Sequence, residues 1–230
     1  MGDTKNLWLF DYDDGLVYER FSQCEDYTGQ ITAYLKNNYD FCGKSILEIG
    51  AGSGKFTGFL ADSCDSLYVV ERSKSLMNIN QTKNFARHIE YELNDVKDAK
   101  LPPKHFDLVF GGWSMTSMRD SFAEIFGVLK GTLKDGGKIV LVENAGNDEF
   151  ASITGIDELS AKMRSFYKSV GFVEKAILDT VIDLPNKDVF YDAFPNQRGV
   201  ELRSTIIRHR VLILEASADS LKGGDYYENS

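Results

Sequence analysis

Cysteine is scarce in this sequence, and the few cysteines follow no ligand pattern. Only three occur among 230 residues, Cys24, Cys42 and Cys64, so they are odd in number and widely spaced. That arrangement excludes a disulfide framework and a zinc site built on paired cysteines. It is typical of reduced thiols in a cytoplasmic protein, which is the location we expect.

Three other features are missing, and each excludes a class of protein or site. No run of lysines and arginines offsets the net charge of −9, so a nucleic acid is not expected as a partner. No window approaches the roughly 18 uninterrupted apolar residues of a membrane-spanning helix, and the N-terminus lacks a signal-peptide pattern. No cluster of metal-ligating side chains is present, so no metal is expected.

The composition that remains is that of one ordinary folded domain. Hydrophobic residues make up 43% and charged residues 27% of a chain long enough for a single large core. No internal repeat and no low-complexity linker divides it. The last stretch, 217–230, is polar and contains glycine, which predicts a flexible tail.

Short apolar runs at regular intervals predict seven strands. They cover residues 45–49, 67–70, 89–93, 106–110, 138–143, 172–184 and 204–216. Helical patterns separate most of them, and strands that alternate with helices form a parallel sheet covered on both faces. The last two strands follow each other directly, which indicates an antiparallel pair. We therefore predict an α/β three-layer sandwich with a mostly parallel seven-stranded sheet and a C-terminal antiparallel strand pair.

Two helices have recognisable limits in the sequence. Ser22 and Glu25 have the spacing of a capping box in front of a helix near 23–37. A second helix is predicted over 122–133, where apolar residues recur at helical spacing, and Gly136-Gly137 is expected to end it.

A glycine-rich loop follows the first predicted strand. Gly50, Gly52 and Gly54 alternate there, and such a turn lets the backbone approach a ligand closely in front of a helix N-terminus. A nucleotide P-loop needs a longer spacing and a hydroxyl residue where Phe56 stands, so that interpretation fails. The dinucleotide fingerprint fits poorly, because Lys55 stands where its third glycine belongs.

The segment Leu47-Glu48-Ile49-Gly50-Ala51-Gly52-Ser53-Gly54 resembles the acidic-x-G-x-G-x-G motif of class I S-adenosylmethionine-dependent methyltransferases. The resemblance extends over 45–216, because three more features occur in the family's order. Glu71 ends the second strand, Asn94-Asp95-Val96 follows the third, and Phe106–Phe110 forms the fourth. The resemblance implies a Rossmann-like fold with S-adenosylmethionine as the cofactor.

The resemblance also implies which residues bind that cofactor. Glu71, at the carboxyl end of a strand, would accept hydrogen bonds from the ribose hydroxyls, unless it only caps the next helix. Asp95 would take the adenine amino group while the backbone N–H of Val96 serves a ring nitrogen; alternatively, Asp95 is a turn residue. Glu48 would organise the methionine end, or it is a buried, paired carboxylate. The loop and its neighbours complete the expected set: Gly50, Ala51, Gly52, Gly54, Arg72 and Gly111.

Candidates for catalysis stand at the carboxyl ends of the fourth and fifth predicted strands. Trp113 would wall a methyl-transfer chamber or stack on a cationic acceptor, unless it is a core residue. Glu143 would bind or deprotonate an acceptor amine, unless it only forms a turn. None of the histidines is an obvious base, because two precede strands at the opposite sheet edge and one lies inside the last strand. They are His88, His105 and His209.

The N-terminal segment 1–44 is rich in aromatic residues, including Trp8, Phe10, Tyr12, Tyr18 and Phe21. In the family that the chain resembles, such a segment often folds over the cofactor as a lid, and its tyrosines often touch the substrate. Tyr18 therefore joins Trp113 and Glu143 as a catalytic candidate. A docking arm is the alternative.

These assignments give one structural domain with three parts. They are a helical lid or substrate segment (1–44), a cofactor-binding core (45–216) and a flexible tail (217–230). Within the core, the long connection 186–203 carries several aromatic residues, which suggests a substrate wall or a dimer contact.

The sequence thus predicts an enzyme that transfers a methyl group from S-adenosylmethionine to a small-molecule acceptor, an amine or a hydroxyl. Positioning can contribute roughly 7–11 kcal/mol, against roughly 3–5 kcal/mol from a general base, so geometry is expected to dominate. The alternatives are a peptide or protein N-methyltransferase and a catalytically inactive, methyltransferase-like partner subunit. A nicotinamide-dependent oxidoreductase is opposed by Lys55 and by the terminal antiparallel pair. The protein is expected to be a monomer or a homodimer.

Overall fold

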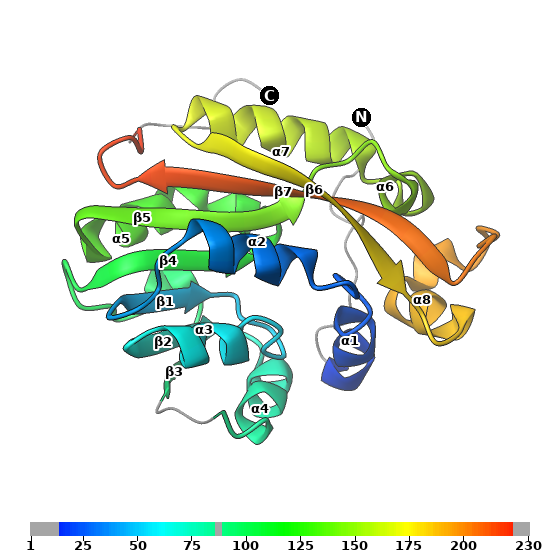
Figure 1. The fold of residues 1–230 in the computed structure, drawn as a ribbon, viewed down its shortest axis with the longest axis horizontal. Coiled ribbons are helices and arrows are strands. Elements are labelled where there is room, and N and C mark those ends of the chain that lie inside the picture. Colours follow the sequence, from blue (N-terminus) through cyan, green and yellow to red (C-terminus); the bar gives the residue numbers. More distant parts are fainter. Residues whose placement is uncertain (1–13, 86–88, 223–230) are drawn as a thin grey trace.

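The computed structural model describes residues 14–85 and 89–222 (Figure 1). These residues form seven strands and the helices that cover them. The strands are β1 (Ser45–Ile49), β2 (Ser66–Glu71), β3 (Ile89–Leu93), β4 (Phe106–Gly112), β5 (Leu133–Asn144), β6 (Val173–Asp183) and β7 (Ile206–Ser217). The helices are α1 (Gly15–Ser22), α2 (Gln30–Asn38), α3 (Thr57–Ser63), α4 (Lys74–Thr82), α5 (Phe122–Thr132), α6 (Glu149–Thr154), α7 (Asp157–Ser169) and α8 (Lys187–Ala193). Within this described part of the chain, none of the helices has the length and apolar character that crossing a membrane requires.

The strands form a single sheet in the order β3-β2-β1-β4-β5-β7-β6. Strands β1 to β5 pair in parallel, whereas β7 runs antiparallel to both β5 and β6. The predicted fold class is confirmed, including the C-terminal antiparallel pair. The chain extends from β1 to β2 on one side and returns to β4 on the other. The carboxyl end of β1 is therefore the switch point at which open α/β sheets bind ligands.

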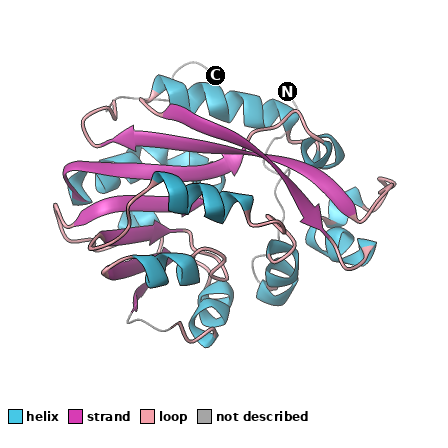
Figure 2. Cartoon of the chain, in the orientation of Figure 1, coloured by secondary structure: helices cyan, strands magenta, loops and turns pink. Residues whose placement is uncertain are grey.

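Alternating side chains of the central strands build two hydrophobic layers, one on each face of the sheet. Leu47 and Ile49 belong to the layer shared with α5 and α7. Ile46 belongs to the layer shared with α2 and α3, on the opposite face. Figure 2 shows helices in front of the sheet and behind it, as this pattern requires. The three-layer sandwich follows from the period-2 alternation of these apolar residues.

A third hydrophobic cluster joins the end of β6 and the start of β7 to helices that are far apart in the sequence. We call α1, α6 and α8 together the cap; in Figure 1 they gather near the end of β6 and the start of β7. Phe21 of α1 contacts two other rings of this cluster. Its ring centroid lies 5.0 Å from that of Phe194, in an edge-to-face contact, and 6.2 Å from that of Phe150. These contacts attach the N-terminal helix to the C-terminal half of the chain.

The helix predicted near 23–37 is wrong in its limits and in its cap. Ser22 ends α1 instead of capping a helix, and residues 23–28 form turns. Gly29 is the N-cap of α2, and Asp26, which has a left-handed backbone (φ +50°), accepts the N–H of Ile31 in the first turn of that helix at 3.1 Å. The Lys55 ammonium bonds the carbonyl oxygens of Ser22 and Glu25, which satisfies the end of α1.

The predicted end of the helix over 122–133 is also wrong. Helix α5 stops at Thr132, and Leu133 already belongs to β5, where it pairs with Phe106. Gly136 lies inside β5, near a register shift between β4 and β5. A buried leucine fits the stripe of a helix and the inner face of a strand equally well, so the apolar pattern could not locate this boundary.

Two further regions differ from expectation. The connection 186–203 contains α8, which the sequence pattern does not predict, and α6 is likewise unexpected. Ala218 and Leu221, which fall within the predicted flexible tail, are buried in the main core, so the folded part extends past 216. Residues 223–230 lie outside the described part.

Candidate functional site

The glycine loop after β1 takes a conformation that favours glycine and leaves no room for side chains. Gly50 and Gly52 have φ angles of +58° and +56°, in the left-handed region. A Cβ on Gly50 would lie 2.6 Å from Cβ of Ser114, and one on Gly52 would lie 3.2 Å from Cε1 of Tyr18. The bare backbone of the loop therefore forms one wall of the adjoining space.

Glu71, the last residue of β2, holds this loop in place. One carboxylate oxygen accepts the N–H of Gly52 at 2.8 Å, and the other accepts the N–H of Ser73 at 2.7 Å. Burial raises the pKa of Glu71, while these two N–H groups act in the opposite direction. The next helix, α4, is capped by the hydroxyl of Ser73, which accepts the N–H of Leu76 at 3.3 Å.

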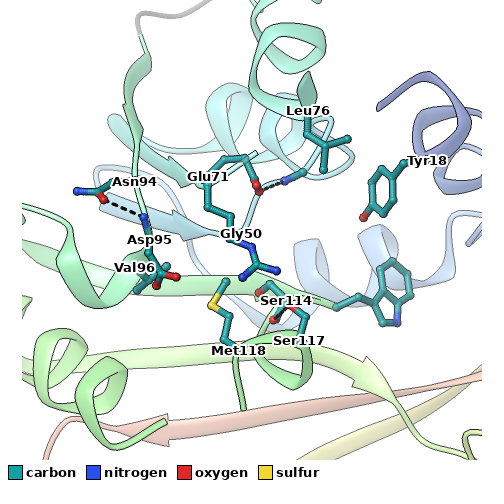
Figure 3. Close-up of a pocket in the computed structure, with 13 residues that line it drawn as sticks. Tyr18, Gly50, Glu71, Leu76, Asn94, Asp95, Val96, Ser114, Ser117 and Met118 are labelled. Carbon is teal, nitrogen blue, oxygen red and sulfur yellow. Dashed lines mark hydrogen bonds between the residues drawn. The ribbon is translucent and has the colours of Figure 1, made fainter. Parts of the chain in front are cut away.

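The glycine loop and Glu71 open onto a solvent-accessible pocket, which we call the loop cavity. It is lined by Tyr18, Gly50, Gly52, Glu71, Arg72, Leu76, Asn94, Asp95, Val96, Trp113, Ser114, Ser117 and Met118. Figure 3 shows Asp95 and Val96 on one side and Tyr18, from α1, on the other. The carboxyl ends of β1, β2, β3 and β4 meet here, at the switch point of the sheet.

Six of the residues predicted to bind the cofactor line the loop cavity, and four do not. Glu48, Ala51, Gly54 and Gly111 are the four that do not. Glu48 lies beneath the loop, where its carboxylate accepts the hydroxyl of Thr57 at 2.7 Å, and burial raises its pKa to about 8. Gly54 faces the side chain of Asn80, and Gly111 faces Ser114 and Leu141.

Asp95 combines a position at the loop cavity with a local structural role. Its carboxylate accepts the N–H of Lys97 at 3.2 Å and so caps the 3₁₀ turn Val96–Asp98. Its own N–H is bonded to the side-chain oxygen of Asn94 at 2.9 Å (Figure 3). The turn holds Asp95 and Val96 at the cavity wall.

A second pocket adjoins the loop cavity, and we call it the aromatic chamber. Its lining residues are Tyr18, Phe21, Glu25, Trp113, Thr116, Ser117, Glu143, Asn144, Phe150 and Phe194. Tyr18, Trp113 and Ser117 line both cavities, so they form the boundary between them. All three predicted catalytic residues, Tyr18, Trp113 and Glu143, meet at this chamber.

Glu143 is a buried carboxylate at the end of β5 with three hydrogen-bond donors. Thr116 donates its backbone N–H at 3.2 Å and its hydroxyl at 2.9 Å, and the Tyr167 hydroxyl donates at 3.2 Å. Burial raises the pKa of Glu143 to about 7, although these donors stabilise the ionised form. These hydrogen bonds hold the side chain in one orientation, and its pKa lies near neutral pH.

Trp113 has a left-handed backbone (φ +50°), and its backbone N–H donates to the carbonyl of Val142 at 2.7 Å. Its ring stacks on His209 with 5.9 Å between ring centroids. Nε2 of His209 is 2.8 Å from the side-chain oxygen of Asn144, and burial lowers the histidine pKa to about 3. His209 is therefore a neutral ring packed behind Trp113 in the chamber wall.

Some chamber residues have no counterpart in the sequence prediction, and some predicted residues lie outside the described part of the chain. Glu25 was predicted only as part of a capping box. Phe150 carries no sequence signal, because the packing of the cap brings it to the chamber. Phe194 belongs to the aromatic connection predicted to wall a substrate site. The aromatic residues Trp8, Phe10 and Tyr12, and also His88, lie outside the described residues. Among residues 14–85 and 89–222, no group of three or more His, Cys, Asp or Glu side chains is placed to hold a metal.

Comparisons with known proteins point to one chemistry. A family model described as a methyltransferase domain matches residues 47–141. Phosphoethanolamine N-methyltransferase 1 of Arabidopsis thaliana is 31% identical over 106 residues, which cover 44% of this chain and 22% of the relative. An uncharacterised methyltransferase of Geobacillus kaustophilus is 26% identical over 202 residues, which cover 86% of this chain and 92% of that relative. The chain thus spans only about a quarter of the plant phosphoethanolamine enzymes it matches.

Solved structures show the same fold at low identity. A candidate methyltransferase from Bacillus halodurans matches 83% of this chain and 99% of its own, with a TM-score of 0.63 and 12% identity. Phosphoethanolamine N-methyltransferase 2 of Haemonchus contortus was solved with S-adenosyl-L-methionine. The match covers 83% of this chain and 52% of the Haemonchus chain, with a TM-score of 0.55 and 14% identity.

Proposed function

The chain belongs to the class I S-adenosylmethionine-dependent methyltransferase family, and we propose that it transfers a methyl group from this cofactor to a small-molecule acceptor, an amine or a hydroxyl. The observation that carries the proposal is the pair of adjoining cavities. One lies against the glycine loop and the other against Glu143, and Tyr18, Trp113 and Ser117 separate them.

The loop cavity has the features that S-adenosylmethionine requires. Gly50 and Gly52 present bare backbone to the cavity, and a Cβ on either would meet Ser114 or Tyr18. Glu71 would hold the ribose hydroxyls through charge-assisted hydrogen bonds, while Asp95 and the N–H of Val96 would hold the adenine. Bound there, the cofactor supplies an electrophilic methyl group on a positively charged sulfur.

The cap would act as the lid over this site. Tyr18 and Phe21 come from α1, within the segment 1–44, and Phe194 follows α8. Their rings would exclude water and hold the acceptor close to the shared boundary, which is the positioning that methyl transfer mainly needs. A chamber lined by side chains from the cap supports a small acceptor rather than a protein surface.

Calorimetric titration with S-adenosylhomocysteine, with NADH titrated in parallel, tests the cofactor half of the proposal. We expect micromolar binding of S-adenosylhomocysteine and no heat from NADH. Binding of NADH alone would favour an oxidoreductase, and binding of neither would favour the inactive partner subunit. Release of S-adenosylhomocysteine from S-adenosylmethionine in the presence of candidate acceptors then tests the transfer itself.

A further inference from the structure

The aromatic chamber combines rings with carboxyl groups. Its rings are those of Tyr18, Phe21, Trp113, Phe150 and Phe194. Its carboxyl groups are those of Glu25 and Glu143, which come from different parts of the fold: one follows α1 of the cap, and the other lies at the end of β5. Among the described residues that line the chamber, none is a lysine, an arginine or a histidine.

The rings are held in place by their own packing. Phe21 and Phe194 meet edge to face at 5.0 Å, and Phe150 lies 5.8 Å from Phe194. Trp113 is backed by the neutral ring of His209. Because aromatic faces carry negative partial charge, a wall of rings attracts a cation without needing a counter-charge of its own.

The two carboxyl groups add to this preference. Burial raises the pKa of both Glu25 and Glu143 to about 7, and for Glu25 the nearby Lys55 charge acts in the opposite direction. A cation between them would lower both values and stabilise the ionised forms, whereas an anion would face two like charges. The Lys55 ammonium offsets part of this preference. It donates to the carbonyls of Ser22 and Glu25 and lies 5.9 Å from the centroid of the Trp113 ring, although Lys55 is not among the residues that line the chamber.

Building on the methyl transfer proposed above, we propose that the acceptor is an organic amine with an apolar body and no phosphate or carboxylate group, bound in the aromatic chamber between Glu25 and Glu143. The apolar body would fill the space among the rings. This class differs from phosphoethanolamine, the compound in the names of several relatives, because a phosphate group would find no cationic partner among the described lining residues.

Glu143 is the better placed of the two carboxyl groups to accept the proton. It is bonded to Thr116, and the next residue, Ser117, lies on the boundary with the loop cavity. The ammonium gives one proton to the Glu143 carboxylate, and the freed nitrogen lone pair forms the N–CH₃ bond. The S–CH₃ bond breaks with its electron pair remaining on sulfur, which leaves a neutral thioether and a methylated ammonium.

Matched ligands test the acceptor class by calorimetry on the protein saturated with S-adenosylhomocysteine. The probes are phenethylamine, 2-phenylethanol, which differs only in the charged group, and phosphoethanolamine. We expect phenethylamine to bind at least tenfold more tightly than the alcohol and phosphoethanolamine to show no saturable binding. The inference is wrong if the alcohol or phosphoethanolamine binds more tightly than phenethylamine, or if phenethylamine does not bind.

Variants locate the charge that the amine meets. Glu143→Gln should weaken phenethylamine binding about tenfold and leave S-adenosylhomocysteine binding unchanged. Glu90→Gln, an exposed carboxylate on β3, is the matched control and should change neither. Equal phenethylamine affinity in wild type and Glu143→Gln would remove Glu143 from the amine site. Failure of the wild-type protein to bind S-adenosylhomocysteine would instead contradict the proposed function itself, so the two failures are distinguishable.

Discussion

The substitution Gly52→Ala separates the backbone requirement of the glycine loop from its role in binding. Gly52 has φ +56°, and its N–H is bonded to the Glu71 carboxylate. A Cβ there would lie 3.2 Å from Cε1 and 3.3 Å from the hydroxyl oxygen of Tyr18, tighter than ordinary contacts. The added methyl group would therefore displace the Tyr18 ring and occupy space at the wall of the loop cavity.

Gly43→Ala provides a control with the same conformational cost. Gly43 precedes β1 and has φ +67°, and a Cβ added to it would have no atom within 4 Å. An alanine in the left-handed region costs about 1–2 kcal/mol at either position. The two variants should thus lose similar amounts of folding free energy, and any difference in ligand affinity reports the methyl group at the cavity.

The assay is chemical denaturation of both variants followed by calorimetric titration with S-adenosylhomocysteine. Gly43→Ala should bind as the wild type does, and Gly52→Ala should bind at least tenfold more weakly, which corresponds to about 1.4 kcal/mol. If Gly52→Ala is destabilised but binds with wild-type affinity, the loop is not the wall against which the cofactor lies, and the assignment of the loop cavity is refuted.

Three further substitutions test other parts of the site. Glu71→Gln should weaken S-adenosylhomocysteine binding by about 1.5–3 kcal/mol, because it removes a charged hydrogen-bond acceptor; unchanged affinity would exclude a ribose contact. Burial raises the pKa of Glu48 to about 8, so the folded state holds this proton more tightly than the unfolded chain, and stability falls as pH rises from 4.5 to about 8. Glu48→Gln should therefore lose less stability than the wild type over that range in denaturation curves, and equal losses would contradict the argument. Lys55→Met should accelerate amide exchange in α1, whose final carbonyls lose their ammonium donor, and unchanged exchange would show that the cap is held by its apolar contacts alone.

The strands were predictable because the signals that define them are local. β1 is a short apolar run that leads directly into the glycine loop, and Glu71 follows another such run. The positions of Gly50, Gly52 and Glu71 at one cavity follow from topology, because parallel strands bring their carboxyl ends to the same edge of a sheet.

Helix limits depended on contacts that the sequence does not display. The spacing of Ser22 and Glu25 satisfies a capping box, but α1 ends at Ser22, where Lys55, thirty-three positions away, bonds the Ser22 carbonyl. Asp26, in the turn that follows, then accepts the N–H of Ile31 in the first turn of α2. These two hydrogen bonds satisfy a carbonyl at the end of α1 and an N–H at the start of α2. Both helix ends are therefore satisfied by side chains that the local sequence spacing does not identify.

The two cavities differ in how much of each could be predicted, and the difference has a physical origin. The loop cavity is built largely from backbone and from residues that directly follow strands, so contiguous motifs describe it. The aromatic chamber takes side chains from the cap, and Phe21, Phe150 and Phe194 meet only through their mutual packing. Each could be replaced without altering the glycine motif, so the motif carries no information about the acceptor. The chemistry of the acceptor therefore has to be inferred from the assembled chamber, whose rings and carboxyl groups favour an amine.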